Sequence, residues 1–301
     1  MKELLQQKLE QLKIKLKTIN TSWFDRFFDM LDKVEIDEQT IIETMDFAFS
    51  DEMVRGYRMG GYYNIFNKNQ KTKSIIENFF KYLSDMAENL GKEKFKEFLK
   101  NSLKQIKVDY AEYLKGKHSA PTNFFNLFMR NLVIANPQDV EMKHMGAKIE
   151  NLSNENEGRI DVLLGGVSIG HLEYDQMESN TPLLSFFEFR TLPGLERLGL
   201  GTYMFSEFCR EVVEKRPDYA VLACNVAKDK DGSKTYSAWG AYPVNTTFSN
   251  MDERIVDTIP ITQEEYKNRP GPFIYYFSPS VVKKCAENQV RYPRPDTALT
   301  I

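Results

Sequence analysis

The sequence predicts an α+β fold in which an all-helical first part precedes a mixed sheet. Through the first 137 residues, apolar side chains recur three and four positions apart, the spacing of amphipathic helices. After Pro137 the pattern changes to alternation, clearest in the segment 158–164, and Gly165-Gly166 provides a hairpin turn. We therefore expect a helical domain of unknown role at 1–137, a sheet-containing domain at 138–287 and a C-terminal tail at 288–301.

Within the first part, two segments interrupt the helical pattern. Residues 68–73 are polar and are expected to form a loop. The segment 54–66 combines glycines, arginines and tyrosines, so it either turns a corner with its rings in the core or presents a binding surface. Helices are expected near 3–19, from Thr21 or Ser22 past Leu31, from Asp37 to Phe49, near 74–90, near 92–107 with a continuation to Leu114, and from Pro121 to Asn136.

Composition bears on the partners, the redox compartment and the membrane association that we expect for this protein. The net charge of −3 and the pI near 5.8 argue against nucleic acid as a partner, although the first part is mildly basic. The three cysteines, Cys209, Cys224 and Cys285, have no metal-ligand spacing and are typical of a reducing compartment. No run of 18 apolar residues is present. We expect a cytoplasmic protein that does not span a membrane.

A glycine-rich turn organises the second part. An apolar, aromatic run at 183–190 is typical of a buried strand, and the turn 193–201 follows it. A helical stripe then continues to about Lys215. Glycines let backbone N–H groups approach a ligand, and the first turn of a helix leaves its N–H groups unpaired at the positive end of the dipole. The turn is therefore suited to phosphate, or else its glycines serve close packing.

On three points this part resembles the GNAT superfamily of N-acyltransferases. Pro193, Gly199 and Gly201 have the separations of that family's acyl-CoA pyrophosphate loop, although Glu196 stands where the family has Arg or Gln. The order of expected strands and helices over 140–278 is similar, and the segment 236–242 looks like the family's Tyr-x-x-x-Gly-aromatic segment. We expect Glu196 to point away from the phosphates.

The resemblance implies acetyl-CoA, or another acyl-CoA, as cosubstrate and no metal. Asn225 resembles a family asparagine that faces the cofactor, although a longer loop than usual separates it from Tyr236. Lys228, Lys230 and Lys234 either meet the 3′-phosphate or belong to a solvated loop. The implied cofactor-binding residues are Leu192, Arg197, Leu198, Gly199, Leu200, Gly201, Thr202 and Asn225.

Acyl transfer to an amine needs a base for the amine, donors for the oxyanion and an acid for the departing thiolate. The resemblance makes Tyr236 the acid. Glu188 is the first candidate for the base, and on a regular strand it shares a face with Phe186 and Arg190. Glu188 could instead pair with Arg190 structurally. Other candidates are Glu173, His171 or a water relay.

The sequence thus predicts an acyl-CoA-dependent N-acyltransferase that works by direct attack of a small-molecule or protein amine. The alternative from another class is a catalytically silent module with a degenerate GNAT fold, which binds CoA or another protein. A third alternative, an enzyme that acetylates aminoacyl-tRNA, rests on the mildly basic first part. Homodimer formation stays open.

Overall fold

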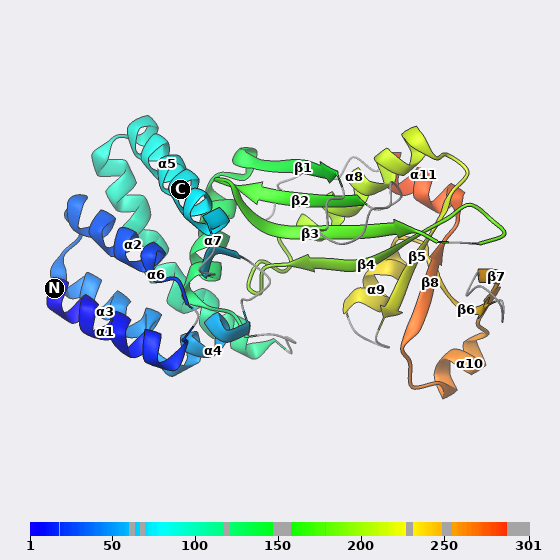
Figure 1. Cartoon of the computed structure of the whole chain (residues 1–301), viewed down its shortest axis with the longest axis horizontal. Helices are drawn as coiled ribbons and strands as arrows, with labels where there is room; N and C mark the ends of the chain where they lie inside the picture. Colours follow the sequence, from blue (N-terminus) through cyan, green and yellow to red (C-terminus); the bar gives the residue numbers. More distant parts are fainter. Residues whose placement is uncertain are drawn as a thin grey trace.

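The computed structural model describes residues 1–17, 19–59, 64–66, 70–116, 121–146, 158–177, 179–226, 231–248 and 255–287. The first part is helical, as predicted, and occupies one end of the molecule (Figure 1). Its elements are α1 (Lys2–Lys15), α2 (Ser22–Lys33), α3 (Glu38–Ala48), α4 (Asp51–Met59), η2 (Asn64–Phe66), α5 (Gln70–Leu90), α6 (Lys92–Lys115), α7 (Phe124–Ala135) and η3 (Pro137–Asp139).

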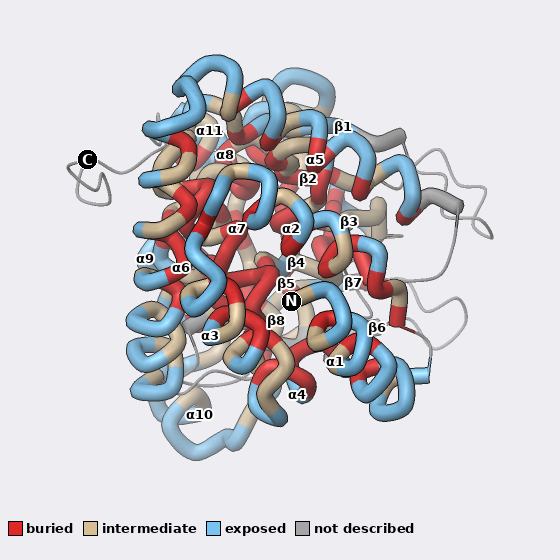
Figure 2. Tube along the Cα trace, turned by 90° about the vertical axis from the view of Figure 1, so that its left-hand side faces the viewer, coloured by how far each residue is buried: buried red, intermediate tan, exposed pale blue. Residues whose placement is uncertain are grey.

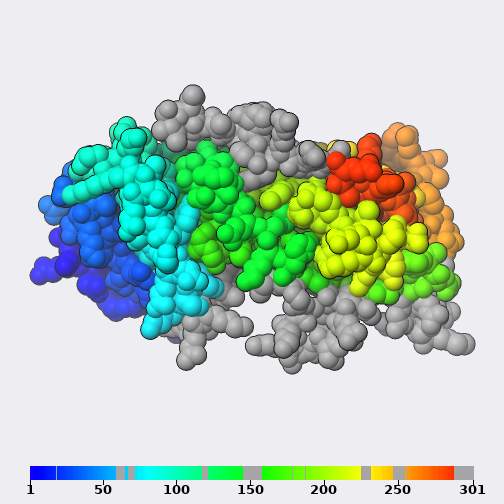
Figure 3. Space-filling view, turned by 90° about the horizontal axis from the view of Figure 1, so that it is seen from above, coloured from blue at the N-terminus to red at the C-terminus, as the bar shows by residue number. Residues whose placement is uncertain are grey.

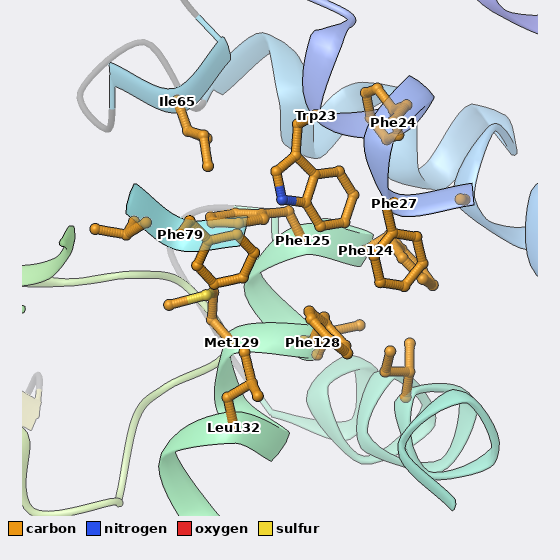
Figure 4. Close-up of a cluster of buried hydrophobic side chains, with 14 of the residues drawn as sticks. Trp23, Phe24, Phe27, Ile65, Phe79, Phe124, Phe125, Phe128, Met129 and Leu132 are labelled. Carbon is orange, nitrogen blue, oxygen red and sulfur yellow. The ribbon is translucent and has the colours of Figure 1, made fainter. Parts of the chain in front are cut away.

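Aromatic rings fill the centre of the helices. Trp23 on α2 is fully buried and stacks on Phe27 at 4.7 Å between ring centroids. Its edge meets Phe125 of α7 at 5.1 Å (Figure 4). The central helix α7 is apolar on nearly every side, as expected for a helix surrounded by others. The remaining helices turn their buried residues inward and their exposed residues outward (Figure 2).

Eight strands of the described part form one mixed sheet, in the order β1-β2-β3-β4-β5-β8-β6-β7. The hairpin predicted at Gly165-Gly166 joins β2 to β3, and both glycines have positive φ, as a type I′ turn requires. The sheet consists of β1 (Val140–Gly146), β2 (Gly158–Leu164), β3 (Val167–Gln176), β4 (Leu183–Thr191), β5 (Ala220–Val226), β6 (Tyr242–Phe248), β7 (Ile255–Pro260) and β8 (Phe273–Phe277).

Helices α8 (Leu200–Lys215) and α11 (Pro279–Glu287) pack against each other and share one face of the sheet (Figure 1). Phe205 and Phe208 of α8 lie in one core cluster with Ile160, Leu172 and Phe186 from three strands. The short helix α9 (Asp231–Ala238) packs into the same cluster through Tyr236. The face that these helices cover is called the α8 face below.

The helical part and the sheet are joined by a continuous core. One buried cluster contains Trp23, apolar residues of α7, Val162 and Ile169 on the sheet, and Leu195 in the turn before α8. Figure 3 shows the sheet elements seated directly against the helices. The α+β class is confirmed, whereas the boundary at residue 137 stays a prediction.

Several sequence expectations need correction. Helix α5 begins at Gln70, so residues 70–73 of the polar loop expected at 68–73 are helical, and α6 is one uninterrupted helix to Lys115. The Gly-rich segment begins inside α4, where a Cβ on Gly56 would lie 2.0 Å from Thr122 O, so this glycine serves close packing. The sequence analysis missed β6, β7, α10 (Gln263–Asn268) and α11.

The tail predicted at 288–301 lies outside the described residues. Among the helices of the described chain, none combines the length and the apolar character that crossing a membrane demands.

Candidate active site

Strands β4 and β5 diverge, and the predicted site residues lie around the point of divergence. The two strands pair in parallel only from Leu183↔Ala220 to Phe186↔Ala223. Beyond that pair β4 continues along β3 to Thr191, while β5 follows β8 as far as Val226↔Phe273 (Figure 1). The backbone groups on the β5 side of β4 therefore lose their strand partner after Phe186, and they become available to a ligand.

The glycine turn connects the diverging end of β4 to α8. Gly199 has φ +87° and occupies the N-cap position of the helix, and Arg197 has φ +65°. A non-glycine residue in this conformation stores strain, which is common at ligand-binding turns. The first hydrogen bond of the helix runs from Tyr203 N–H to Gly199 O at 3.0 Å. The N–H groups of Leu200, Gly201 and Thr202 lie before it and therefore have no carbonyl partner within the helix. The turn can therefore offer several N–H donors to an anion.

The predicted cofactor residues divide into two groups. Leu192, Leu198 and Leu200 are buried in the core, so they could reach a ligand only through their backbone. Arg197 is exposed, and Gly201 and Thr202 are half-buried at the start of α8. A Cβ on Gly201 would lie 3.4 Å from the Phe189 ring, which places the first turn of α8 beside the unpaired stretch of β4.

Asn225 lies inside β5, which continues two residues beyond Cys224, and not directly after the strand. Its side chain lies outside what the structure describes, as do Lys228 and Lys230. The expected role of these residues therefore stays a prediction. Lys234 on α9 is exposed, and Cys224 is half-buried with its Sγ 3.2 Å from Ser185 Oγ.

Glu196 folds back onto its own turn. Its Oε2 accepts a hydrogen bond from Gly194 N–H at 2.7 Å. Burial of Tyr113 on α6 raises the pKa of that tyrosine, and the negative charge of the nearby Glu196 raises it further. The carboxylate is therefore directed toward the helical part of the chain. This placement fits the expectation that Glu196 points away from the phosphates.

Tyr236 lies on the α8 face, beside the last paired residues of β4 and β5. Its ring contacts Phe186 at 5.6 Å and Trp239 at 5.8 Å, and Trp239 stacks on Phe205 at 4.4 Å. Burial raises the pKa of the Tyr236 hydroxyl well above its usual value, so the group keeps its proton at neutral pH. The Tyr236 ring therefore lies next to the divergence with its hydroxyl protonated.

Glu188 does not share a face with Phe186, and this expectation was wrong. Glu188 pairs with Glu173 and Phe186 pairs with Tyr174, so the residue between them on β4 has no counterpart on β3. Such a bulge shifts the alternation of the strand by one position. Glu188 consequently lies on the face of the sheet opposite α8. Arg190 lies on that same face, as predicted, and contacts Glu188 there.

A cluster of charged side chains surrounds Glu188 on this opposite face. His171 Nε2 lies 3.6 Å from Glu188 Oε2, and Arg190 Nε lies 3.0 Å from Glu188 Oε1. Arg159 bonds both oxygens of Asp161 at 2.8 Å and also pairs with Glu173. Asp161 and His171 are buried. Burial, followed by the charge of Arg159, lowers the pKa of His171, so its ring is neutral at neutral pH.

The donor atoms of His171, Glu173 and Glu188 lie within 4.8 Å of one another, which is close enough to hold a cation. Two arginines already compensate these carboxylates, Arg159 on Glu173 and Arg190 on Glu188. A divalent cation would have to displace or oppose both guanidinium groups. The charges therefore fit an ion-pair network better than a metal centre.

Sequence reasoning missed one residue of the site. Arg130 on α7 donates from Nη1 to Gly194 O at 3.0 Å and to Glu196 O at 3.2 Å, so it holds the glycine turn from the helical part. Its separation of more than sixty residues from the turn leaves no local signal. The single hint that the sequence offers is that Arg130 is the one charged residue within the largely apolar stretch 124–135.

Comparisons with known proteins give remote likenesses. No protein-family model matches the chain, and no curated protein matches it. An aminoglycoside acetyltransferase from an uncultured soil metagenomic sample is 14% identical and covers 34% of this chain and 88% of its own, with a TM-score of 0.30. A protein of the GNAT family from Desulfovibrio desulfuricans is 10% identical and covers 46% and 99%, with a TM-score of 0.33.

The AtaT toxin, solved with the C-terminus of the antitoxin AtaR, is 6% identical and covers 48% of this chain and 97% of its own, with a TM-score of 0.32. The solved structures that resemble part of this chain thus include acetyltransferases of the GNAT family, the family that the sequence resembles.

Proposed function

We propose that the protein is an acyl-CoA-dependent N-acyltransferase with acetyl-CoA as its donor. The observation that carries the proposal is the divergence of β4 from β5 immediately before an anion-binding turn. A pantetheine arm needs backbone partners along an extended path, and a pyrophosphate needs clustered N–H donors at its end. The unpaired stretch of β4 would provide the backbone partners for the pantetheine arm, and the start of α8 would provide the N–H donors for the pyrophosphate.

The reacting groups would meet at the divergence from its two sides. The amine nitrogen attacks the acyl carbon, its proton passes to Glu188 directly or through a water molecule, and the carbon–sulfur bond breaks. The thiolate then takes a proton from the Tyr236 hydroxyl, and free CoA leaves. Solvent afterwards accepts the proton from Glu188 and returns one to Tyr236. This assignment is supported by the positions of Glu188 on one face and Tyr236 on the other. Backbone N–H groups of β4 beyond Phe186 would stabilise the oxyanion.

The acceptor would be a small-molecule or protein amine that approaches from the face of Glu188. A neutral amine is the nucleophile, so a base near the attacking nitrogen favours reaction at neutral pH. The rival proposal is a silent module that binds CoA without turnover. It is favoured by two observations, the acidic Glu196 within the turn and the long loop between Asn225 and Tyr236.

Titration calorimetry with acetyl-CoA, followed by a screen of amines for release of the CoA thiol, separates these proposals. We expect saturable binding and acceptor-dependent thiol release. Binding without release for any amine would favour the silent module. Absence of binding at millimolar acetyl-CoA would contradict both proposals.

A further inference from the structure

The turn before α8 is held by side chains of the helical part at three points. Thr122 Oγ1 donates to Pro193 O at 2.7 Å, and Arg130 Nη1 donates to Gly194 O at 3.0 Å and to Glu196 O at 3.2 Å. The accepting groups are all backbone carbonyls. The helical part therefore contacts the carbonyl side of the turn.

A trans peptide directs its C=O and its N–H to opposite sides. Because Arg130 holds Glu196 O, the N–H of the same peptide, which belongs to Arg197, faces away from α7. Arg197 is the residue with φ +65°, a conformation that needs support from its surroundings. The hydrogen bonds of Arg130 supply that support at the preceding peptide.

The guanidinium of Arg130 is itself held in place. Asp109 of α6 lies 3.9 Å from Arg130 Nε, and the Asp109 carboxylate also accepts bonds from Gln105 and Asn131, each at 3.0 Å. This network fixes the aspartate, and the aspartate orients the arginine. On the turn itself, a Cβ on Gly194 would lie 2.8 Å from Thr122 Oγ1, so the turn and the helical part are packed too closely for a larger residue.

We infer that Arg130, oriented by Asp109, is a positioning residue for the acyl-CoA, because it sets the direction in which the turn presents its N–H groups to the pyrophosphate. The inference rests on the proposed function. It gives the helical part a role in binding the donor, through the backbone of the turn and without contact with the reacting atoms. Loss of Arg130 should raise the Kd of the donor by more than a loss of stability alone, measured by the fall in Tm, would explain.

The test compares Arg130→Gln, Arg130→Lys and Asp109→Asn with the wild-type chain. Calorimetry gives the Kd of acetyl-CoA, and thermal unfolding of the unliganded protein gives Tm. Arg130→Gln should raise Kd on the order of tenfold, since charge-assisted hydrogen bonds to the turn are lost. Arg130→Lys keeps one donor and should give a smaller rise. Asp109→Asn should also raise Kd, and its effect should not add to that of Arg130→Gln.

The matched control is Ile106→Val, which removes one methylene group from a fully buried site on the same helix as Asp109. It should lower Tm and leave Kd unchanged. A rise in Kd that follows the fall in Tm across all variants, the control included, would overturn the inference, because general destabilisation would then explain it. If Arg130→Gln does not fold, Arg130→Lys and Asp109→Asn decide by the same criteria.

The outcomes also separate this inference from the proposed function. Wild-type binding together with an unchanged Kd in folded Arg130 and Asp109 variants would overturn the positioning role and leave the proposed function intact. Absence of wild-type binding would overturn the proposed function, and the inference with it.

Discussion

Phe186 and Glu188 lie two residues apart on β4 and point to opposite faces of the sheet. Phe186 packs against Phe205 of α8, and Glu188 contacts His171 and Arg190 on the other side. The bulge between them lies where β4 loses its pairing with β5. The one-residue bulge thus places the Phe186 ring on one face of the sheet at the divergence and the Glu188 carboxylate on the other.

The first prediction concerns Gly201. Gly201→Glu should abolish binding of acetyl-CoA, because it adds bulk and negative charge to the first turn of α8. Gly201→Ala is the matched control: its Cβ would lie 3.4 Å from Phe189, an ordinary contact, so affinity should be retained. Calorimetry on both folded variants measures the difference. Near-normal affinity in Gly201→Glu would place the donor elsewhere on the molecule.

The second prediction concerns the Tyr236 hydroxyl. Tyr236→Phe keeps the ring that packs on Phe186, so the fold and the Kd of acetyl-CoA should survive. Turnover should fall by roughly 10²–10⁴-fold if the hydroxyl protonates the thiolate. Tyr275→Phe, which removes a hydroxyl from the same aromatic cluster, should leave turnover unchanged. Wild-type turnover in Tyr236→Phe would mean that water protonates the thiolate.

The third prediction distinguishes two roles of Glu188. If Glu188 is the base, Glu188→Gln should lower kcat by roughly 10²-fold or more with little change in Tm. Arg190→Gln removes the partner at 3.0 Å and should change kcat far less. If the pair is purely structural, both variants should lower Tm by similar amounts and retain turnover. Steady-state kinetics and thermal unfolding on the two variants decide between these patterns.

The fourth prediction concerns pH. The pKa of His171 lies below its usual 6.5 in the folded protein, so the unfolded chain binds the proton more readily. Stability from this group is complete above pH 6.5 and falls as the pH drops from 6.5 toward the folded pKa. Arg159 opposes the charged ring, while Asp161, Glu173 and Glu188 favour it.

Urea unfolding of the wild type and of His171→Asn between pH 5 and 8 tests this expectation. The wild type should lose free energy of unfolding below pH 6.5, and the variant should lose less. His144→Asn, at an exposed histidine paired with Glu211, is the control. An equal pH dependence in the wild type and His171→Asn would show that other groups cause the loss.

Local patterns were enough to predict most elements. The apolar stripe through Trp23 and Phe27 indicated α2, and Gly165-Gly166 indicated the β2–β3 hairpin. Asp37 indicated the start of α3, and in the structure its side chain accepts a hydrogen bond from Thr40 N–H. The glycine turn with its following helix was also predictable, because strand, turn and helix are contiguous in the chain.

The features that define the site depend on contacts between distant residues. The bulge next to Glu188 is visible only in the register of β4 against β3, because the sequence alone fits a regular strand. The contact of Arg130 with the turn depends on tertiary packing. The missed helix α10 did carry a local signal, the capping box of Thr262 and Glu265.

The continuous core from Trp23 to Met204 also bears on how the chain can be divided. A fragment that ends at residue 137 would leave the apolar residues of the helices without Leu164, Ile169 and Leu195, which belong to the same buried cluster in the intact chain. Exposed surface of this kind promotes self-association. We expect such a fragment to aggregate, and the intact chain to melt in one cooperative calorimetric transition.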